Sequence, residues 1–343
     1  MSRAGRLDLV SIMKLGELGD FIVPFTLRAV SDLGVADVLT SGPAPIGVIA
    51  AKVGADEGAL LRALRALACK GVFTEPEPEV FALTPLAEPL RSDHPLSLRD
   101  VYTLLPSDVQ AWAQLGDTLR TGRPGFDTAH GTDYWSYLAA HREESRRVDL
   151  WMRSINHLHL RTVLPYFAWA EVSTVVDVGG GNGSFLAGVL GRYQALRGTL
   201  FDLPHVVAGA EEILRDVRDR VEVVPGSFFE PGAVPKGADV YVLKTVLPGF
   251  DDAAVVRVLS NVAEAMRPDS TLLLLEAVLP EGDAYDVAKL FDVHTMVLTG
   301  GAHRSAELTG ELLSRAGLTL TEVTPTPTLT VLRAQLSATG TEE

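Results

Sequence analysis

The glycine-rich segment at residues 179–183 constrains this chain most, because four of its five residues are glycine. It follows Val175–Val178, a run rich in β-branched residues that predicts a buried strand. After the glycines, the apolar pairs Phe185/Val189 and Leu186/Leu190 are each separated by four residues. This spacing predicts an amphipathic helix. A strand, a turn without side chains and a helix N-terminus let the backbone direct N–H groups at a ligand.

The spacing of the glycines narrows the choice of ligand. A dinucleotide-binding turn needs glycine or alanine where this chain has Ser184, and the P-loop pattern is absent from the sequence. The remaining pattern runs from Asp177 through Gly179, Gly181 and Gly183. It resembles the turn of S-adenosylmethionine (SAM) methyltransferases, and a plain tight turn between strand and helix is the alternative.

Strands and helices alternate from residue 173 onward, which predicts a doubly wound α/β sheet of mostly parallel strands. The predicted strands are 173–178, 198–203, 221–224, 240–244, 271–278 and 328–334. Ligands of such sheets bind beyond the carboxyl ends of the strands. The length of 343 residues predicts about two domains. From the patterning and the glycine turn we expect a helical winged-helix dimerisation domain at 1–100, a helical linker and substrate-pocket region at 101–170, and the SAM-binding domain at 171–343.

The N-terminal region predicts an oligomer and argues against nucleic acid. The helical segments 7–15 and 21–33 are unusually apolar, so we expect a homodimer that buries them, with burial inside one chain as the alternative. Two helices at 46–53 and 57–71 and a hairpin at 71–83 suggest a winged helix, and hence a DNA-binding regulator as a rival. The wing tip is acidic, at Glu75, Glu77 and Glu79, which a DNA backbone would repel.

The composition and the charge argue against several other classes of protein. The net charge is −14, which argues against polyanionic partners. No apolar run reaches the roughly 18 residues of a membrane span and no signal peptide is recognisable, so we expect a cytoplasmic protein. The single cysteine, Cys69, cannot form an internal disulfide and is expected in the core.

Aromatic residues are frequent between residues 100 and 170. Trp151, Met152, Asn156 and His157 precede the predicted ligand-binding half of the chain and are candidates for a pocket that holds a flat apolar substrate, with ordinary core packing as the alternative. His157 and His159 are two residues apart and face different sides of a helix. We therefore expect no metal site.

Asp202 ends the second predicted strand, 19 residues beyond Gly183 (202 − 183). A carboxylate about 20 residues after such a turn can accept hydrogen bonds from both ribose hydroxyls of a nucleoside. Capping of the following helix is the alternative role.

Several ordered motifs resemble the plant-type small-molecule O-methyltransferases, the group of caffeate and aromatic-polyketide O-methyltransferases. They are the segments 60–67, 83–87, 244–252, 291–305 and 312–318, together with the glycine turn. The resemblance implies transfer of methyl from SAM, with S-adenosylhomocysteine as product, to a hydroxyl of a small aromatic acceptor. It also places His294 and Met296 among the substrate-binding residues.

The same resemblance assigns cofactor contacts. Asp177 and the three glycines of the turn would hold the methionine part, and Asp202 the ribose. Leu203, Phe228 and Phe250 would contact the adenine, where Phe250 replaces the family's tryptophan. Ser227 replaces an aspartate that binds the adenine amino group. Lys244 matches a lysine near the methionyl end.

The catalytic base departs from the family. Pro248 occupies the position of the family's histidine and cannot accept a proton. His303 replaces a glutamate, so we expect His303 to act as the base and Glu276 to orient it, with a substrate-binding or solvated histidine as the alternative. Carboxyl methylation, or a non-methylating hydroxylase or cyclase that binds SAM, would also tolerate Pro248.

Overall fold

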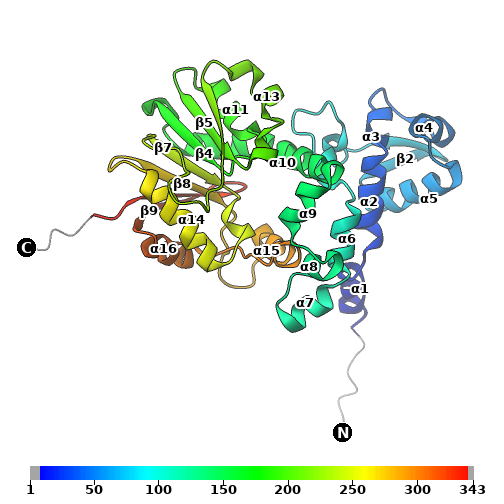
Figure 1. Cartoon of the computed structure of the whole chain (residues 1–343). Coiled ribbons are helices and arrows are strands. Elements are labelled where there is room, and N and C mark those ends of the chain that lie inside the picture. The colour runs from blue at the N-terminus through cyan, green and yellow to red at the C-terminus, as the bar shows by residue number, and fades with distance from the viewer. Residues whose placement is uncertain (1–7, 339–343) are drawn as a thin grey trace, which may run out of the picture. The chain divides into compact units, whose positions relative to one another are not determined.

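The computed structural model describes residues 8–338 of the chain and divides it into two compact units, Met1–Leu104 and Leu105–Glu343 (Figure 1). Each unit has its own buried apolar core. The predicted helical region 101–170 belongs almost entirely to the second unit, with the sheet.

The first unit is mostly helical and contains a small sheet. Its elements are α1 (Leu9–Leu18), α2 (Ile22–Asp32), α3 (Val35–Val38), β1 (Ala44–Pro45), α4 (Ile46–Val53), α5 (Glu57–Ala68), β2 (Phe73–Glu77) and β3 (Val80–Leu83). Leu60, Leu64 and Leu67 of α5 recur at helical spacing and are buried. β2 and β3 pair antiparallel, so the predicted wing is present.

Helix α1 buries none of its residues within the chain. Its large apolar side chains are more than half exposed, among them Val10 at 77% and Leu18 at 77%. Cys69, expected in the core, is instead exposed, because it lies just beyond the last turn of α5. Within residues 8–338, no helix combines the length and apolarity that a bilayer crossing requires.

Five helices open the second unit: α6 (Pro106–Trp112), α7 (Leu115–Thr121), α8 (Gly125–His130), α9 (Tyr134–Ala140) and α10 (Arg142–Val163). Their aromatic residues are largely structural. Phe126, Tyr134 and Leu138 are buried in one cluster with Val297 and Leu298 of α15 (Val287–Leu298). This cluster attaches the helices to the segment that carries His294.

The central sheet has the order β6-β5-β4-β7-β8-β10-β9 within the described residues. Its strands are β4 (Thr174–Val178), β5 (Arg197–Asp202), β6 (Val221–Pro225), β7 (Val240–Lys244), β8 (Thr271–Glu276), β9 (Leu318–Pro325) and β10 (Thr330–Leu336). β4 to β8 pair parallel, whereas β10 pairs antiparallel with β8 and β9. The predicted α/β fold is confirmed; β9, an edge strand, was not predicted.

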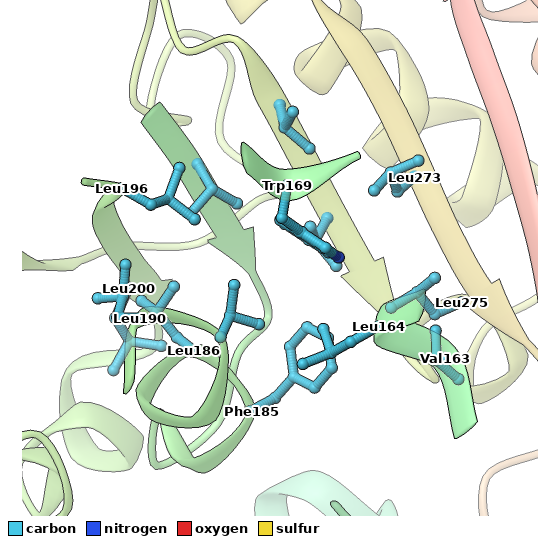
Figure 2. Packing of buried hydrophobic residues seen from close by; sticks show 14 of the residues in the cluster. Val163, Leu164, Trp169, Phe185, Leu186, Leu190, Leu196, Leu200, Leu273 and Leu275 are labelled. Atoms are coloured by element: carbon cyan, nitrogen blue, oxygen red, sulfur yellow. The ribbon is translucent and has the colours of Figure 1, made fainter. Parts of the chain in front are cut away.

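Helices cover both faces of this sheet: α11 (Ser184–Arg192), α12 (Pro204–Val207), α13 (Ala210–Ile213), α14 (Asp252–Ala265) and α16 (Ala306–Arg315). Phe185, Leu186 and Leu190 of α11 pack in one buried cluster with Trp169 and with Leu273 and Leu275 of β8 (Figure 2). Residues of α14 and α16 form a second cluster with alternate residues of the same strands. Because the parallel strands share one direction, β4, β5, β7 and β8 end at one edge, which carries the site.

Candidate active site

The glycine turn needs its glycines for conformation and for space. Gly179, Gly181 and Gly183 have φ values of 70°, 62° and 80°, which L side chains rarely adopt. A Cβ at Gly179 would lie 2.9 Å from Val246 and 3.3 Å from Phe228, whereas a Cβ at Gly181 would meet nothing within 4 Å. The turn is therefore packed at Gly179 and open at Gly181, a cradle that a ligand can approach closely.

Asp202 lies directly beside this cradle. Its Oδ2 accepts a hydrogen bond from the Gly181 N–H at 2.8 Å, and its Oδ1 accepts one from the Leu203 N–H at 2.6 Å. Burial raises the pKa of Asp202. Burial also raises the pKa of Asp149 on α10 to about 6, and the neighbouring Asp202 carboxylate adds to the rise. Each Asp202 oxygen keeps a lone pair for a ribose hydroxyl.

Ionisable groups are buried below the turn. Lys244 is 6% exposed at the end of β7; burial lowers its pKa to about 8, against the attraction of Asp177 and Glu276. Burial raises the pKa of Asp177 to about 7. A Cβ at Gly180 would lie 2.6 Å from the Asp177 carboxyl, so Asp177 supports the turn from inside rather than from its open side.

Helix α10 adds two polar residues to this region. Asn156 donates from Nδ2 to Ser184 Oγ at 2.7 Å. His159 is buried; burial and the nearby Lys244 charge lower its pKa to about 3, which keeps the ring neutral. Among the described residues, Asn156 Oδ1, His159 Nδ1 and Asp177 Oδ2 are buried without a hydrogen-bond partner. The unpartnered atoms of Asn156 and His159, together with the buried Lys244, fit a ligand that carries both ammonium and carboxylate groups, whereas Asp177 lies inside the turn.

Aromatic rings gather where a flat heterocycle would lie. Phe250 contacts Phe228 with ring centroids 5.8 Å apart and Phe229 at 5.2 Å, and it stacks on Trp135 at 6.4 Å. Ser227 accepts a hydrogen bond from the Phe229 N–H at 3.2 Å, so its hydroxyl stabilises the local turn. Trp135 was not predicted, although it lies in the aromatic-rich region 101–170.

The catalytic candidates meet different partners from those expected. Nδ1 of His303 lies 2.9 Å from the carbonyl oxygen of Ala277, and the His303 N–H donates to Asp292 Oδ1 at 2.8 Å. A carbonyl can only accept, so Nδ1 carries the proton and Nε2 keeps its lone pair. Burial lowers the pKa of His303, which favours the neutral ring.

Nδ1 of His303 donates to the Ala277 carbonyl and not to Glu276, which was expected to orient the ring. Oε1 of Glu276 instead accepts from the N–H groups of Val246 at 3.2 Å and Leu247 at 3.3 Å. Burial raises the pKa of Glu276 to about 8. Pro248 is buried in a short 3-10 turn, Leu247–Gly249, and no ionisable group stands in its place.

The remaining predicted substrate residues fall in three environments. Trp151 and Met152 are half-buried on α10, but His157 is exposed and lies near Arg153 and Arg161. His294 stacks on Trp112 at 5.9 Å and accepts a hydrogen bond from its Nε1 at 3.3 Å. Met296 packs against the cluster around Phe126 and Tyr134.

Comparison with known proteins agrees with this geometry. Residues 112–319 match the O-methyltransferase domain family and residues 17–93 match the O-methyltransferase dimerisation domain. A phenazine O-methyltransferase of Lysobacter antibioticus is 37% identical over 328 residues, which cover 95% of each chain. The mitomycin biosynthesis 6-O-methyltransferase of Streptomyces lavendulae is 38% identical over 296 residues, 84% of this chain and 83% of the relative.

A solved structure is similar over nearly the whole chain. An O-methyltransferase from neocarzinostatin biosynthesis, in complex with SAM and 2-hydroxy-5-methyl naphthoic acid, has a TM-score of 0.79 at 31% identity, covering 93% of this chain and 98% of that one. The fold and site define a SAM-dependent methyltransferase. The chain belongs to the O-methyltransferase family, as its resemblance predicted. Its relatives favour O-methylation over the alternatives that Pro248 left open.

Proposed function

We propose that this protein methylates a hydroxyl group of a small aromatic natural product. The observation that carries the proposal is the neutral His303, whose Nδ1 is held by a carbonyl and whose Nε2 is left to accept a proton, at the same sheet edge as the glycine cradle. Relatives that act on phenazine, mitomycin and naphthoate compounds support an aromatic acceptor.

The cofactor contacts follow from the cradle. Gly179, Gly181 and Gly183 let the backbone approach the methionyl part, and Lys244 faces its carboxylate. Asp202 accepts from the ribose hydroxyls, while Leu203, Phe228 and Phe250 enclose the adenine. When bound, SAM would supply a methyl group on a sulfonium; the acceptor oxygen would bond to the methyl carbon while the S–CH3 bond breaks and S-adenosylhomocysteine leaves.

The chain's own contribution to chemistry is alignment and proton transfer. Trp151, Met152, Asn156, His294 and Met296, joined by Trp112, would hold the acceptor ring. As the acceptor oxygen forms its bond to carbon, its proton passes to Nε2 of His303. A phenol has a pKa near about 10, so it is mostly protonated at pH 7 and gains from such a base.

The direct test is incubation of the purified protein with SAM and a panel of hydroxylated naphthoates, phenazines and quinones. Mass spectrometry should detect one added methyl on oxygen and S-adenosylhomocysteine in equal amount. Methyl esters would instead indicate carboxyl methylation. Turnover of the acceptor without cofactor consumption would indicate a non-methylating enzyme. Either result would overturn the proposal.

We also propose that the chain forms a homodimer through α1 and α2. The matched dimerisation domain begins at residue 17, and the apolar side chains of α1 are exposed in the single chain. Light scattering should show twice the chain mass. Leu15→Glu with Leu18→Glu should give a folded monomer; a dimer that persists would place the interface elsewhere.

A further inference from the structure

The turn Val246–Phe250 connects β7 to α14 and carries parts of both sides of the cofactor cradle. At one end Val246 closes against Gly179. At the other end Phe250 contacts Phe228. Thr245, just before the turn, has a φ of 53°, an unfavourable conformation for a β-branched residue. The surrounding structure therefore has to hold this segment.

Two buried ionisable side chains make most of the polar contacts to the turn. Glu276 accepts hydrogen bonds from the N–H groups of Val246 and Leu247. Arg304 donates from Nη1 to the Leu247 carbonyl at 3.2 Å and from Nη2 to the Phe250 carbonyl at 2.8 Å. Its Nε donates to Asp252 Oδ1 at 2.8 Å, at the start of α14. The two side chains are 7% exposed.

The remaining contacts of Glu276 and Arg304 argue against a role of these two residues in proton transfer. Nη1 of Arg304 also donates to the Ala302 carbonyl at 2.9 Å. The two side chains and Pro248 line a cavity with about 20 Å³ of space for water, which Val255, Leu259 and Leu312 also line. Oε2 of Glu276 is buried there without a partner among the described residues. This neutral, enclosed carboxyl faces the interior of the domain.

We propose that Glu276 and Arg304 are positioning residues that clamp the turn Val246–Phe250, so that Val246 and Phe250 close the cofactor cradle. The clamp replaces the expected role of Glu276 as the partner of His303. Its effect on cofactor binding rests on the proposed function, whereas its effect on the turn does not. Since Glu276 acts through an accepting oxygen and not through its charge, an amide can take over its role.

Hydrogen exchange without cofactor tests the clamp on its own. In Glu276→Leu, the peptide covering residues 245–250 should exchange at least about tenfold faster than in the wild type, because two N–H groups lose their acceptor. Glu276→Gln should restore protection. Arg304→Met should also release this peptide, through the two carbonyls. Arg267→Met is the matched control, since Arg267 donates to a loop carbonyl and to Asp239 elsewhere.

Calorimetry with S-adenosylhomocysteine tests the consequence. Glu276→Leu and Arg304→Met should weaken binding about tenfold, with Glu276→Gln within about threefold of the wild type, a range typical of one or two hydrogen bonds. Arg267→Met should lower the Tm but leave the Kd unchanged.

Unchanged exchange and Kd in folded Glu276→Leu and Arg304→Met would overturn the clamp. If Glu276→Leu fails to fold, Arg304→Met decides: unchanged exchange and Kd in that folded variant would overturn the clamp. A wild type that does not bind S-adenosylhomocysteine would refute the proposed function, and the exchange result would still judge the clamp.

Discussion

Replacement of His303 tests the proposed base most sharply. His303→Gln keeps a donor for the Ala277 carbonyl but has no lone pair that can take a proton at neutral pH. Loss of a positioned general base typically costs about 10²–10⁴-fold in rate. We therefore expect kcat to fall at least about 10²-fold, or about 2.7 kcal/mol in the barrier, with little change in the KM for SAM.

The pH dependence gives an independent signature. The base works in its neutral form, and burial lowers the pKa of His303 below its ordinary 6.5, so the midpoint of the acid limb of the wild-type rate should lie below pH 6.5. The Asp292 carboxylate raises this pKa, so Asp292→Asn should move the acid limb to still lower pH. His303→Gln should lack the limb.

His141→Gln is a matched control for this experiment. Its Nδ1 also meets a backbone carbonyl, that of Tyr137 at 2.8 Å, but the residue is exposed outside the site. Steady-state rates between pH 5 and 9 on one acceptor compare the variants. A His303→Gln enzyme within about threefold of the wild type at every pH would refute the assignment of the base.

Three further predictions follow from single residues. Gly301→Ala should destabilise the fold by about 3 kcal/mol or more, because its Cβ would overlap the Pro248 carbonyl, whereas Gly181→Ala meets open space and should cost about 1 kcal/mol of φ strain in urea unfolding. Equal effects would contradict this packing. Asp202→Asn should weaken S-adenosylhomocysteine binding roughly 10–100-fold by calorimetry, since charged hydrogen bonds contribute about 1.5–3 kcal/mol; an unchanged Kd would exclude ribose recognition by Asp202. His159 has a pKa of about 3 when folded and near 6.5 when unfolded, so stability decreases as pH falls between these values, by about 2 kcal/mol at pH 5. His159→Leu should lose this dependence of stability on pH. If the free energies of unfolding of variant and wild type fall in parallel as the pH decreases, the prediction is refuted.

Much of the site could be predicted because it depends on local backbone chemistry. The glycine turn, Asp202 and Lys244 each follow a predicted strand, and strand ends of a parallel sheet meet at one edge. The resemblance to the family also placed His303 where the family has a glutamate, which made it the candidate for the missing base. These assignments required only sequence order and residue type.

Other parts of the site depend on distant contacts that spacing does not encode. Helical periodicity could not distinguish His157 from His159, yet the fold exposes the first and buries the second near Lys244. The same holds for Trp112, which meets His294 across 182 positions of sequence.

The sequence by itself determined the fold class, the cofactor cradle and the absence of a base at Pro248, because these follow from periodicity, glycine spacing and side-chain chemistry. Only the tertiary structure decided what Glu276 and His303 contact. Their hydrogen bonds join strand β8 to the turn Val246–Phe250 and to the loop before α16, and such pairings depend on how the elements pack. Tertiary packing therefore determined that His303 donates to a backbone carbonyl and that Glu276 accepts hydrogen bonds from the turn Val246–Phe250.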